Sequence, residues 1–225
     1  MRVGKSALVV LAGLAFGAAS FYGGGLVGRR LLRPPALRST VRLARNPPLV
    51  PLVAVRTLDG RMLSSAAWRG KVTIVTFWAT WCGPCREEAA DFLALERRYP
   101  DHVRIVGLSV DEDADAVRRW VAAHGVDYPV AIASAELQRR FGGIEAVPTS
   151  FVLDPEGRIV QAHVGLYPPL VYDLEVRVLA GLPVDAIVER VDDQGQVRPG
   201  DHADLTEVPG ADLSGLTPAA RRRQP

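Results

Sequence analysis

The chain has 225 residues, of which 48% are apolar and 23% are charged, and both values are ordinary for a globular protein. They exclude a fibrous chain and a chain that is disordered throughout. The net charge is only +2, so charge alone gives no argument for nucleic-acid binding. The length suits one domain of ordinary size with additional segments.

The N-terminal segment begins with positive groups and continues as a long apolar run. Residues 7–27 form 21 mostly apolar positions, which at about 1.5 Å rise per residue span roughly 30 Å of hydrocarbon. We therefore expect a signal anchor or transmembrane segment at residues 1–28. A cleaved signal peptide, cut after a small-residue site such as Ala18-Ala19-Ser20, is the alternative.

Residues 29–50 are rich in arginine and proline, and this composition predicts an extended linker. The arginines also outnumber the positive groups before the apolar run. The positive-inside rule, taken literally, places the C-terminal domain in the cytoplasm. A signal at the start of a chain, in contrast, usually leaves its short positive region inside and directs the C-terminal domain to the outside. The two arguments conflict.

The residues from 51 to 181 alternate between strand and helix patterns. Strand–helix–strand order over the first half demands a parallel pair and a right-handed crossover. The pattern predicts an α/β fold, a mixed sheet covered by helices. After Gly181 the chain is rich in Asp, Gly, Pro and Arg, and we expect residues 182–225 to be largely disordered. The predicted elements in chain order are a hairpin over 53–63, a buried strand over 71–78, a helix over 84–99, a strand over 103–110, a helix over 114–124, a strand over 128–133, a helix over 134–141, a hairpin over 149–164 and a helix over 168–180.

Both cysteines of the chain lie in the stretch FWATWCGPCREE, at positions 82 and 85. Closing so short a loop removes little entropy, so a structural disulfide is a weak explanation. Cys82 lies where the buried strand ends and the helix begins, and a helix N-terminus stabilises a thiolate. We expect an exposed Cys82 to attack a partner disulfide and a shielded Cys85 to resolve the mixed disulfide.

Glu88 lies three residues beyond Cys85, on nearly the same face of the predicted helix. It is a candidate to exchange a proton with Cys85 at the resolving step. The alternative is an ordinary acid in the first helical turn, where the helix dipole favours negative charge.

Metal binding is a second explanation for the cysteine pair. Two thiolates suit Cu(I), but the chain has no third cysteine, and its four histidines show no ligand spacing. A structural zinc site needs four ligands, so we expect no metal site.

Several motifs together resemble the thioredoxin superfamily, in particular its membrane-anchored TlpA/ResA-like thiol–disulfide oxidoreductases. The resemblance implies a thioredoxin-like mixed sheet with an N-terminal β-hairpin and a central strand–helix insertion. It also implies no cofactor beyond a redox-active Cys82–Cys85 disulfide. The motifs that carry it are TLDGR at 57–61, RGK at 69–71, FWATWCGPCREE at 77–88, VGLSVDED at 106–113 and VPTSFVLDPEGRIV at 147–160.

The resemblance also assigns the residues that bind the partner. It makes Pro148 a cis-proline opposite the cysteines, with the backbone of Val147 offered to an extended partner segment. Trp81, adjacent to Cys82, is expected to line the partner groove. Gly83 and Pro84, which shape the loop between the cysteines, complete the expected binding set.

One departure from the superfamily bears on the chemistry. Many thioredoxins carry a buried acid in the strand before the motif, where this chain has Thr76. Proton transfer at Cys85 cannot use that acid, which strengthens the case for Glu88.

The resemblance implies an exported enzyme in the bacterial inner membrane, with its catalytic domain on the periplasmic side, and we prefer this orientation to the one that the arginines indicate. We expect it to reduce disulfides of exported proteins, such as those of cytochrome c maturation or copper-site assembly. Its electrons then come from a membrane thiol donor. A Cu(I)-binding metallochaperone and an oxidase or isomerase on the same fold are the alternatives.

Overall fold

The structure is a computed structural model that describes residues 39–205. The predicted anchor at 1–28 lies outside these residues, as do the last 20 residues of the predicted tail. Between residues 39 and 205, no helix has the length and apolar character needed to cross a membrane.

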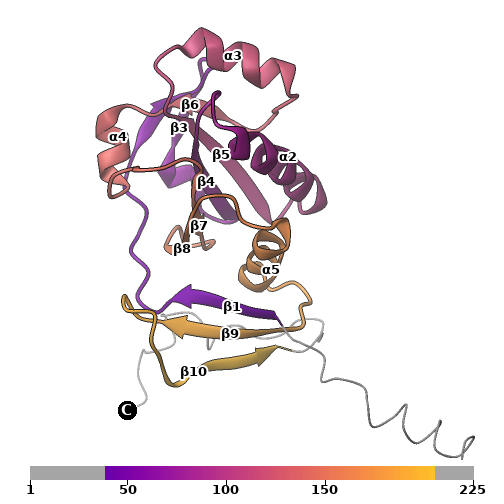
Figure 1. Ribbon diagram of the computed structural model, residues 1–225. Helices are drawn as coiled ribbons and strands as arrows, with labels where there is room; N and C mark the ends of the chain where they lie inside the picture. The colour runs from indigo at the N-terminus through magenta and orange to yellow at the C-terminus, as the bar shows by residue number, and fades with distance from the viewer. Residues whose placement is uncertain (1–38, 206–225) are drawn as a thin grey trace, which may run out of the picture. The chain divides into compact units, whose positions relative to one another are not determined.

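A five-stranded mixed sheet, in the order β6-β5-β4-β7-β8, forms the centre of the fold (Figure 1). The central strand β4 (Val72–Trp78) is parallel to β5 (Val103–Ser109), which is parallel to β6 (Val130–Ile132). On its other side β4 is antiparallel to β7 (Thr149–Leu153), which continues to β8 (Ile159–Val164). The predicted α/β fold is therefore confirmed.

The alternation of side chains along β4 divides the core between the two faces of the sheet. Ile74 and Trp78 belong to one apolar cluster and Val75 and Phe77 to the other. The first cluster contains residues of α2 (Gly83–Arg98) and α5 (Pro169–Leu179), and the second contains residues of η1 (Ser65–Trp68) and α4 (Ala135–Arg140). Thr76 shares the face of Ile74 and Trp78, which places it beneath α2.

Two smaller predicted features are also present. The N-terminal hairpin consists of β2 (Ala54–Arg56) and β3 (Met62–Ser64). The insertion between β5 and β7 supplies α3 (Ala114–Ala123), β6 and α4. Asp113 caps α3 by accepting hydrogen bonds from the backbone amides of residues 115 and 116.

A second, three-stranded sheet was not predicted. It has the order β1-β9-β10, with β1 (Ser39–Ala44) parallel to β9 (Ala186–Val191) and β10 (Val197–Leu205) antiparallel to β9. Figure 1 shows it below α5 and β8, both of which contact β1. The predictions of an extended linker through residue 50 and of disorder from residue 182 are therefore wrong for these strands.

The second sheet forms because its apolar residues alternate with charged ones. In β1, Val41 and Leu43 are buried beside the exposed Arg42, and β9 buries Ala186 and Val188. The high arginine content of residues 29–50 led to the prediction of a linker, although the apolar residues of β1 recur at every second position. Arg45, just after β1, pairs with Asp192 and Asp201, which ties the strand to the turn between β9 and β10 and to β10 itself.

Two leucines of the predicted linker test whether this sheet stabilises the protein. Leu43 is 2% exposed and belongs to the main apolar cluster, whereas Leu49 is 58% exposed. We expect Leu43→Ala to lower the free energy of unfolding by about 2–5 kcal/mol and Leu49→Ala to change it by less than about 0.5 kcal/mol. Urea denaturation measures both. Equal small effects would show that the first strand is dispensable.

Candidate active site

The two cysteines form a disulfide at the N-terminus of α2, with their Cα atoms 5.3 Å apart. Cys82 is the N-cap residue, and the backbone amide of Cys85 donates a hydrogen bond to the Cys82 sulfur over 3.2 Å. Pro84 occupies the first turn, where its missing N–H costs nothing. The unpaired amides and the positive dipole end of α2 therefore face the sulfur of Cys82.

Burial differs from the expectation for one cysteine. Cys82 is only 6% exposed, so the prediction of an exposed sulfur is wrong for the disulfide form, although Cys85 at 2% is more deeply covered. The bond to Cys85 and the packing against Val147 enclose the first sulfur. Around it the surface is open, because Trp81 is 72% exposed and Gly83 and Pro84 are exposed as well.

The Val147–Pro148 peptide bond is cis, as the resemblance predicts. The carbonyl oxygen of Val147 lies 3.6 Å from the Cys82 sulfur. Val147 is half-buried and Pro148 is buried. The backbone amide of Gly165 donates to the Pro148 carbonyl over 2.8 Å, which brings the segment after β8 to the same place. The fold thus joins the cysteines with a dipeptide 65 residues away.

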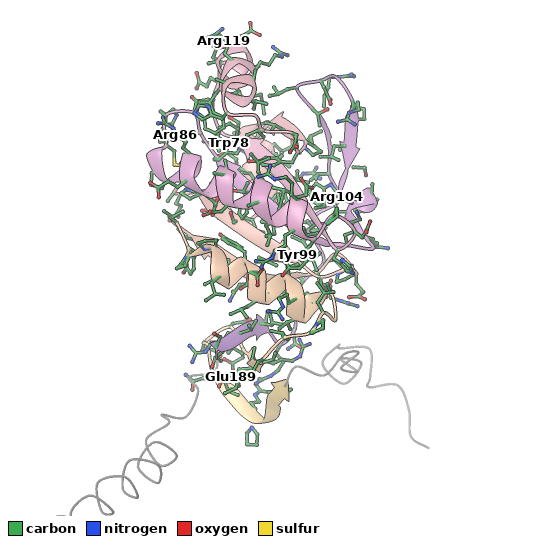
Figure 2. The ribbon with its side chains drawn as sticks, turned by 90° about the vertical axis from the view of Figure 1, so that its right-hand side faces the viewer. Trp78, Arg86, Tyr99, Arg104, Arg119 and Glu189 are labelled. Carbon is green, nitrogen blue, oxygen red and sulfur yellow. A yellow bond between two sulfur atoms is a disulfide. The ribbon has the colours of Figure 1, made fainter. Side chains whose placement is uncertain are left out.

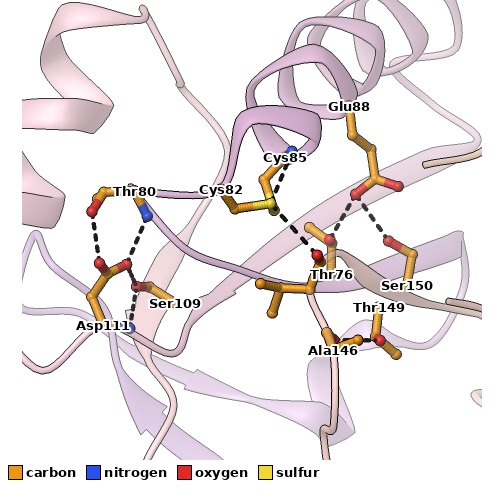
Figure 3. Close-up of a disulfide and its surroundings, with 11 residues drawn as sticks. Thr76, Thr80, Cys82, Cys85, Glu88, Ser109, Asp111, Ala146, Thr149 and Ser150 are labelled. Atoms are coloured by element: carbon orange, nitrogen blue, oxygen red, sulfur yellow. Dashed lines mark hydrogen bonds between the residues drawn. A yellow bond between two sulfur atoms is a disulfide. The ribbon is translucent and has the colours of Figure 1, made fainter. Parts of the chain in front are cut away.

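Glu88 lies on α2 three residues after Cys85 and is buried in the core, at 2% exposure, so it is not a solvated acid of a helix start (Figure 3). Three hydroxyl groups donate to its carboxylate: Thr76 of β4 over 3.0 Å, Ser150 of β7 over 3.2 Å and Tyr172 of α5 over 2.8 Å. Thr76, which stands where many thioredoxins have an acid, therefore holds the acid that α2 supplies.

Burial raises the pKa of Glu88 above its ordinary value, because the charged form loses its hydration. The hydrogen bonds from Tyr172, Thr76 and Ser150 oppose this change, as does the charge of His163. A carboxyl group held in this way keeps its proton to a higher pH than a solvated glutamate does.

The raised pKa of Glu88 predicts how stability depends on pH. The folded state binds this proton more tightly than the unfolded state, so wild-type stability falls as pH rises from the ordinary value of 4.5 through the raised pKa. Glu88→Gln removes this dependence. The free energy of unfolding of Glu88→Gln, relative to that of the wild type, should therefore increase as pH rises. The total increase should be about 1.4 kcal/mol for each unit by which the pKa is raised.

Chemical denaturation at a series of pH values measures this difference. Other titrating groups are shared by the two proteins and cancel in the comparison. A difference that stays constant or shrinks as pH rises would contradict the buried, protonatable carboxyl group.

A second carboxylate fixes the loop that precedes Cys82. Asp111, just after β5, accepts hydrogen bonds from the backbone amide of Thr80 over 2.9 Å and from its hydroxyl over 2.6 Å (Figure 3). The hydroxyl of Ser109 donates to the same carboxylate over 2.7 Å. Its structural role is to anchor the segment that carries Trp81.

Sequence reasoning missed the partners of Glu88. Tyr172 and Ser150 lie on an apolar helix and a buried strand, where period and composition indicate only core packing. Tyr172 is 84 residues from Glu88, so only the tertiary fold brings the two together. The one available signal was the missing acid at Thr76, which left proton exchange with Cys85 to another group.

This arrangement of residues suits thiol–disulfide exchange at the N-terminus of α2. Figure 2 shows the exposed Arg86 beside the sulfur atoms and Tyr99 at the opposite end of the helix. Over residues 39–205, no three side chains of the types His, Cys, Asp and Glu gather as metal ligands. The fold and the site together define a thioredoxin-like thiol–disulfide oxidoreductase.

Comparisons with known proteins agree with this class. A model of the family described as Redoxin matches residues 46–174, so the chain belongs to the Redoxin family. It is 33% identical over 116 residues to thiol-disulfide oxidoreductase ResA of Bacillus thuringiensis (strain Al Hakam), which covers 51% of this chain and 67% of that protein. It is 30% identical over 124 residues to sporulation thiol-disulfide oxidoreductase A of Bacillus subtilis (strain 168), covering 52% and 74%.

A solved structure supports the same assignment. The thiol:disulfide interchange protein of the thioredoxin family from Chlorobium tepidum TLS superposes with a TM-score of 0.56 at 36% identity. The superposition covers 60% of this chain and 98% of that one.

Proposed function

We propose that this protein reduces disulfides of exported proteins, with Cys82 as the nucleophile and Cys85 as the resolving thiol. The observation that carries the proposal is the position of the disulfide, with Cys82 at the N-cap of α2 and the Val147 carbonyl beside its sulfur. The first feature favours a thiolate, and the second offers a backbone acceptor to a partner strand.

The reaction begins with the reduced pair. The Cys82 thiolate attacks one sulfur of the partner disulfide, and the other partner sulfur leaves as a thiolate. Cys85 then loses its proton and attacks the Cys82 sulfur. The bond between Cys82 and the partner breaks, and the second partner sulfur leaves as a thiolate while the Cys82–Cys85 disulfide forms. The partner has gained two electrons, and its two thiolates take up one proton equivalent to that released by Cys85 and one from water.

Glu88 is the proposed acceptor of the Cys85 proton. It shares a helix face with Cys85 and is shielded from water, so no solvent base competes with it. A raised pKa suits this work, because a base is most effective when its pKa lies near the working pH.

The partner is proposed to bind across the exposed residues around the disulfide. Trp81 and Leu166 are 72% and 41% exposed, and Leu166 follows Gly165, whose backbone amide donates to the carbonyl of the cis-proline. An extended segment could pair with the backbone of Val147 and cover both apolar side chains. Gly83 and Pro84 leave the approach to Cys82 free of bulk.

The reductive direction and the location outside the cytoplasm rest on the apolar segment at 1–28 and on the resemblance to the TlpA/ResA-like branch. An exported reductase needs a source of electrons, for which we propose a membrane thiol donor. Substrates of the haem-attachment type, with a CxxCH pair oxidised to a disulfide, fit such an enzyme.

The test is thiol–disulfide exchange between the full-length protein and a peptide with a disulfide-bonded CxxCH motif. The reduced protein should convert the peptide to its dithiol and become oxidised in equal amount, which mass spectrometry reads as a gain of two hydrogens on the peptide. Transfer only in the reverse direction, from reduced peptide to oxidised protein, would identify an oxidase and contradict the proposal.

A further inference from the structure

A second pair of buried ionisable groups lies next to the Glu88 cluster. His163 of β8 and Glu175 of α5 are 4% and 3% exposed. The imidazole Nε2 lies 2.9 Å and 3.1 Å from the two carboxylate oxygens of Glu175. Burying two ionisable groups is costly, and replacing such a pair by apolar groups is often harmless to stability. Its presence one helical turn from Tyr172 therefore calls for an explanation in function.

His163 is adjacent to two of the three groups that donate to Glu88. Its ring packs edge-to-face on that of Tyr172, with the ring centroids 5.1 Å apart and the planes at 85°. It also lies opposite Ser150 in the register of β7 and β8. The positive charge of a protonated His163 lowers the pKa of Glu88.

We propose that the His163–Glu175 pair is a positioning element for Glu88, which holds Tyr172 through a ring contact and supplies a positive charge that favours the proton-accepting carboxylate. This inference rests on the proposed role of Glu88 at the resolving step. The pair lines an open cavity of about 370 Å³ among β1, β8 and α5. The pair therefore borders solvent at this cavity.

Other charges near the pair do not replace it. Arg42 of β1 lines the same cavity, but its side chain is 66% exposed and pairs with Glu189. Tyr167, before α5, packs on the imidazole with centroids 4.3 Å apart and carries no positive charge. Within residues 39–205, the titratable groups near His163 or Glu88 include Tyr172 and Glu175 of α5, Tyr167 before it, Arg42 of β1 and Tyr128 before β6.

The first test is a titration of the Glu88 carboxyl carbon by ¹³C NMR in the oxidised full-length protein, with the signal assigned by its loss in E88Q. H163Q/E175Q replaces the ion pair with two amides and leaves no buried charge unpaired. We expect the Glu88 midpoint to rise by at least about half a pH unit in this variant. H124Q is the matched control, because His124 is exposed and stacks on Trp120 instead. An unchanged midpoint in folded H163Q/E175Q would overturn the inference.

The second test is kinetic. With a chromogenic aromatic disulfide, the second release of aromatic thiolate reports the resolving attack by Cys85. Below the midpoint, H163Q/E175Q should slow this release about threefold, the loss that corresponds to half a pH unit, and the rate should recover at high pH. A purely structural role would lower the rate equally at every pH.

E88Q separates the two proposals. If E88Q slows the resolving step and H163Q/E175Q shifts neither the titration nor the rate, the positioning role fails and the proposed function stands. If E88Q leaves the resolving step unchanged, the proposed role of Glu88 fails. In the E88Q background, H163Q/E175Q should cause no further pH-dependent loss. H163Q alone gives the same comparison with a single replacement if the double variant does not fold.

Discussion

Cys85→Ser is expected to accumulate a stable mixed disulfide between Cys82 and its partner. The variant keeps the nucleophile at the N-cap of α2 but lacks the thiol that releases the partner. Mass spectrometry of the reduced variant, mixed with a disulfide-bonded peptide, should find one covalent adduct per chain. The adduct should disappear on addition of dithiothreitol.

Cys82→Ser is the matched variant and should form no such adduct. Its remaining thiol is 2% exposed, so a partner disulfide has little access to it. Peptide reduction should fall by at least about a thousandfold in either single variant, as expected when a covalent nucleophile or its partner is removed. An adduct that forms at Cys85 in the Cys82→Ser protein would reverse the assigned roles.

Glu88→Gln should slow the resolving step by about a hundredfold, the lower end of what a positioned base contributes. It should leave the first attack by Cys82 unchanged, because a helix N-terminus, where Cys82 lies, favours a thiolate without help from Glu88. The amide keeps the shape of the carboxyl group and can still accept from Tyr172 or Thr76. The two releases of aromatic thiolate from the chromogenic disulfide separate the steps.

The pH profile completes this prediction. In the wild type the second release should rise with pH as Glu88 ionises, with a midpoint above the ordinary value because burial raises its pKa. In Glu88→Gln this rise of the second release rate with pH should be absent. Equal slowing of both releases would indicate a general disturbance of the site and contradict a specific role in proton transfer.

The sequence was sufficient for the central sheet because each element carries its own period. β4 is apolar at nearly every position, as a strand covered on both faces must be, and α2 repeats its apolar residues at helical spacing. The placement of the cysteines at the start of the helix followed from the predicted junction between strand and helix. Local physics determines these features, so one sequence reveals them.

The second sheet escaped prediction because its strands obey a local rule that composition obscured. The segment AIVERV at 186–191 alternates buried and less buried positions only through Val188, and Asp, Gly and Arg follow closely. Its partner β1 lies about 147 residues earlier. The pairing of β1 with β9 depends on where the chain leaves α5, and neither strand segment alone contains that information.

The site was predictable as far as its covalent chemistry and no further. The sequence has Thr76 where many thioredoxins have an acid, and Glu88 is the acid that could replace it. In the structure the Thr76 hydroxyl donates a hydrogen bond to the Glu88 carboxylate over 3.0 Å. The contributions of Ser150, Tyr172 and His163 depend on strand register and on the packing of α5 over the sheet. Neither can be derived from single-sequence periodicity.

The reduction potential of the Cys82–Cys85 pair tests the central claim most directly. The full-length protein in detergent is equilibrated with defined thiol buffers at about pH 7, and the oxidised fraction is measured after acid quenching. For this two-electron couple about 30 mV corresponds to about 1.4 kcal/mol, so the scale separates the classes well. A reductase predicts a value near or below about −230 mV, whereas a value near about −120 mV belongs to strong oxidants and would contradict the account.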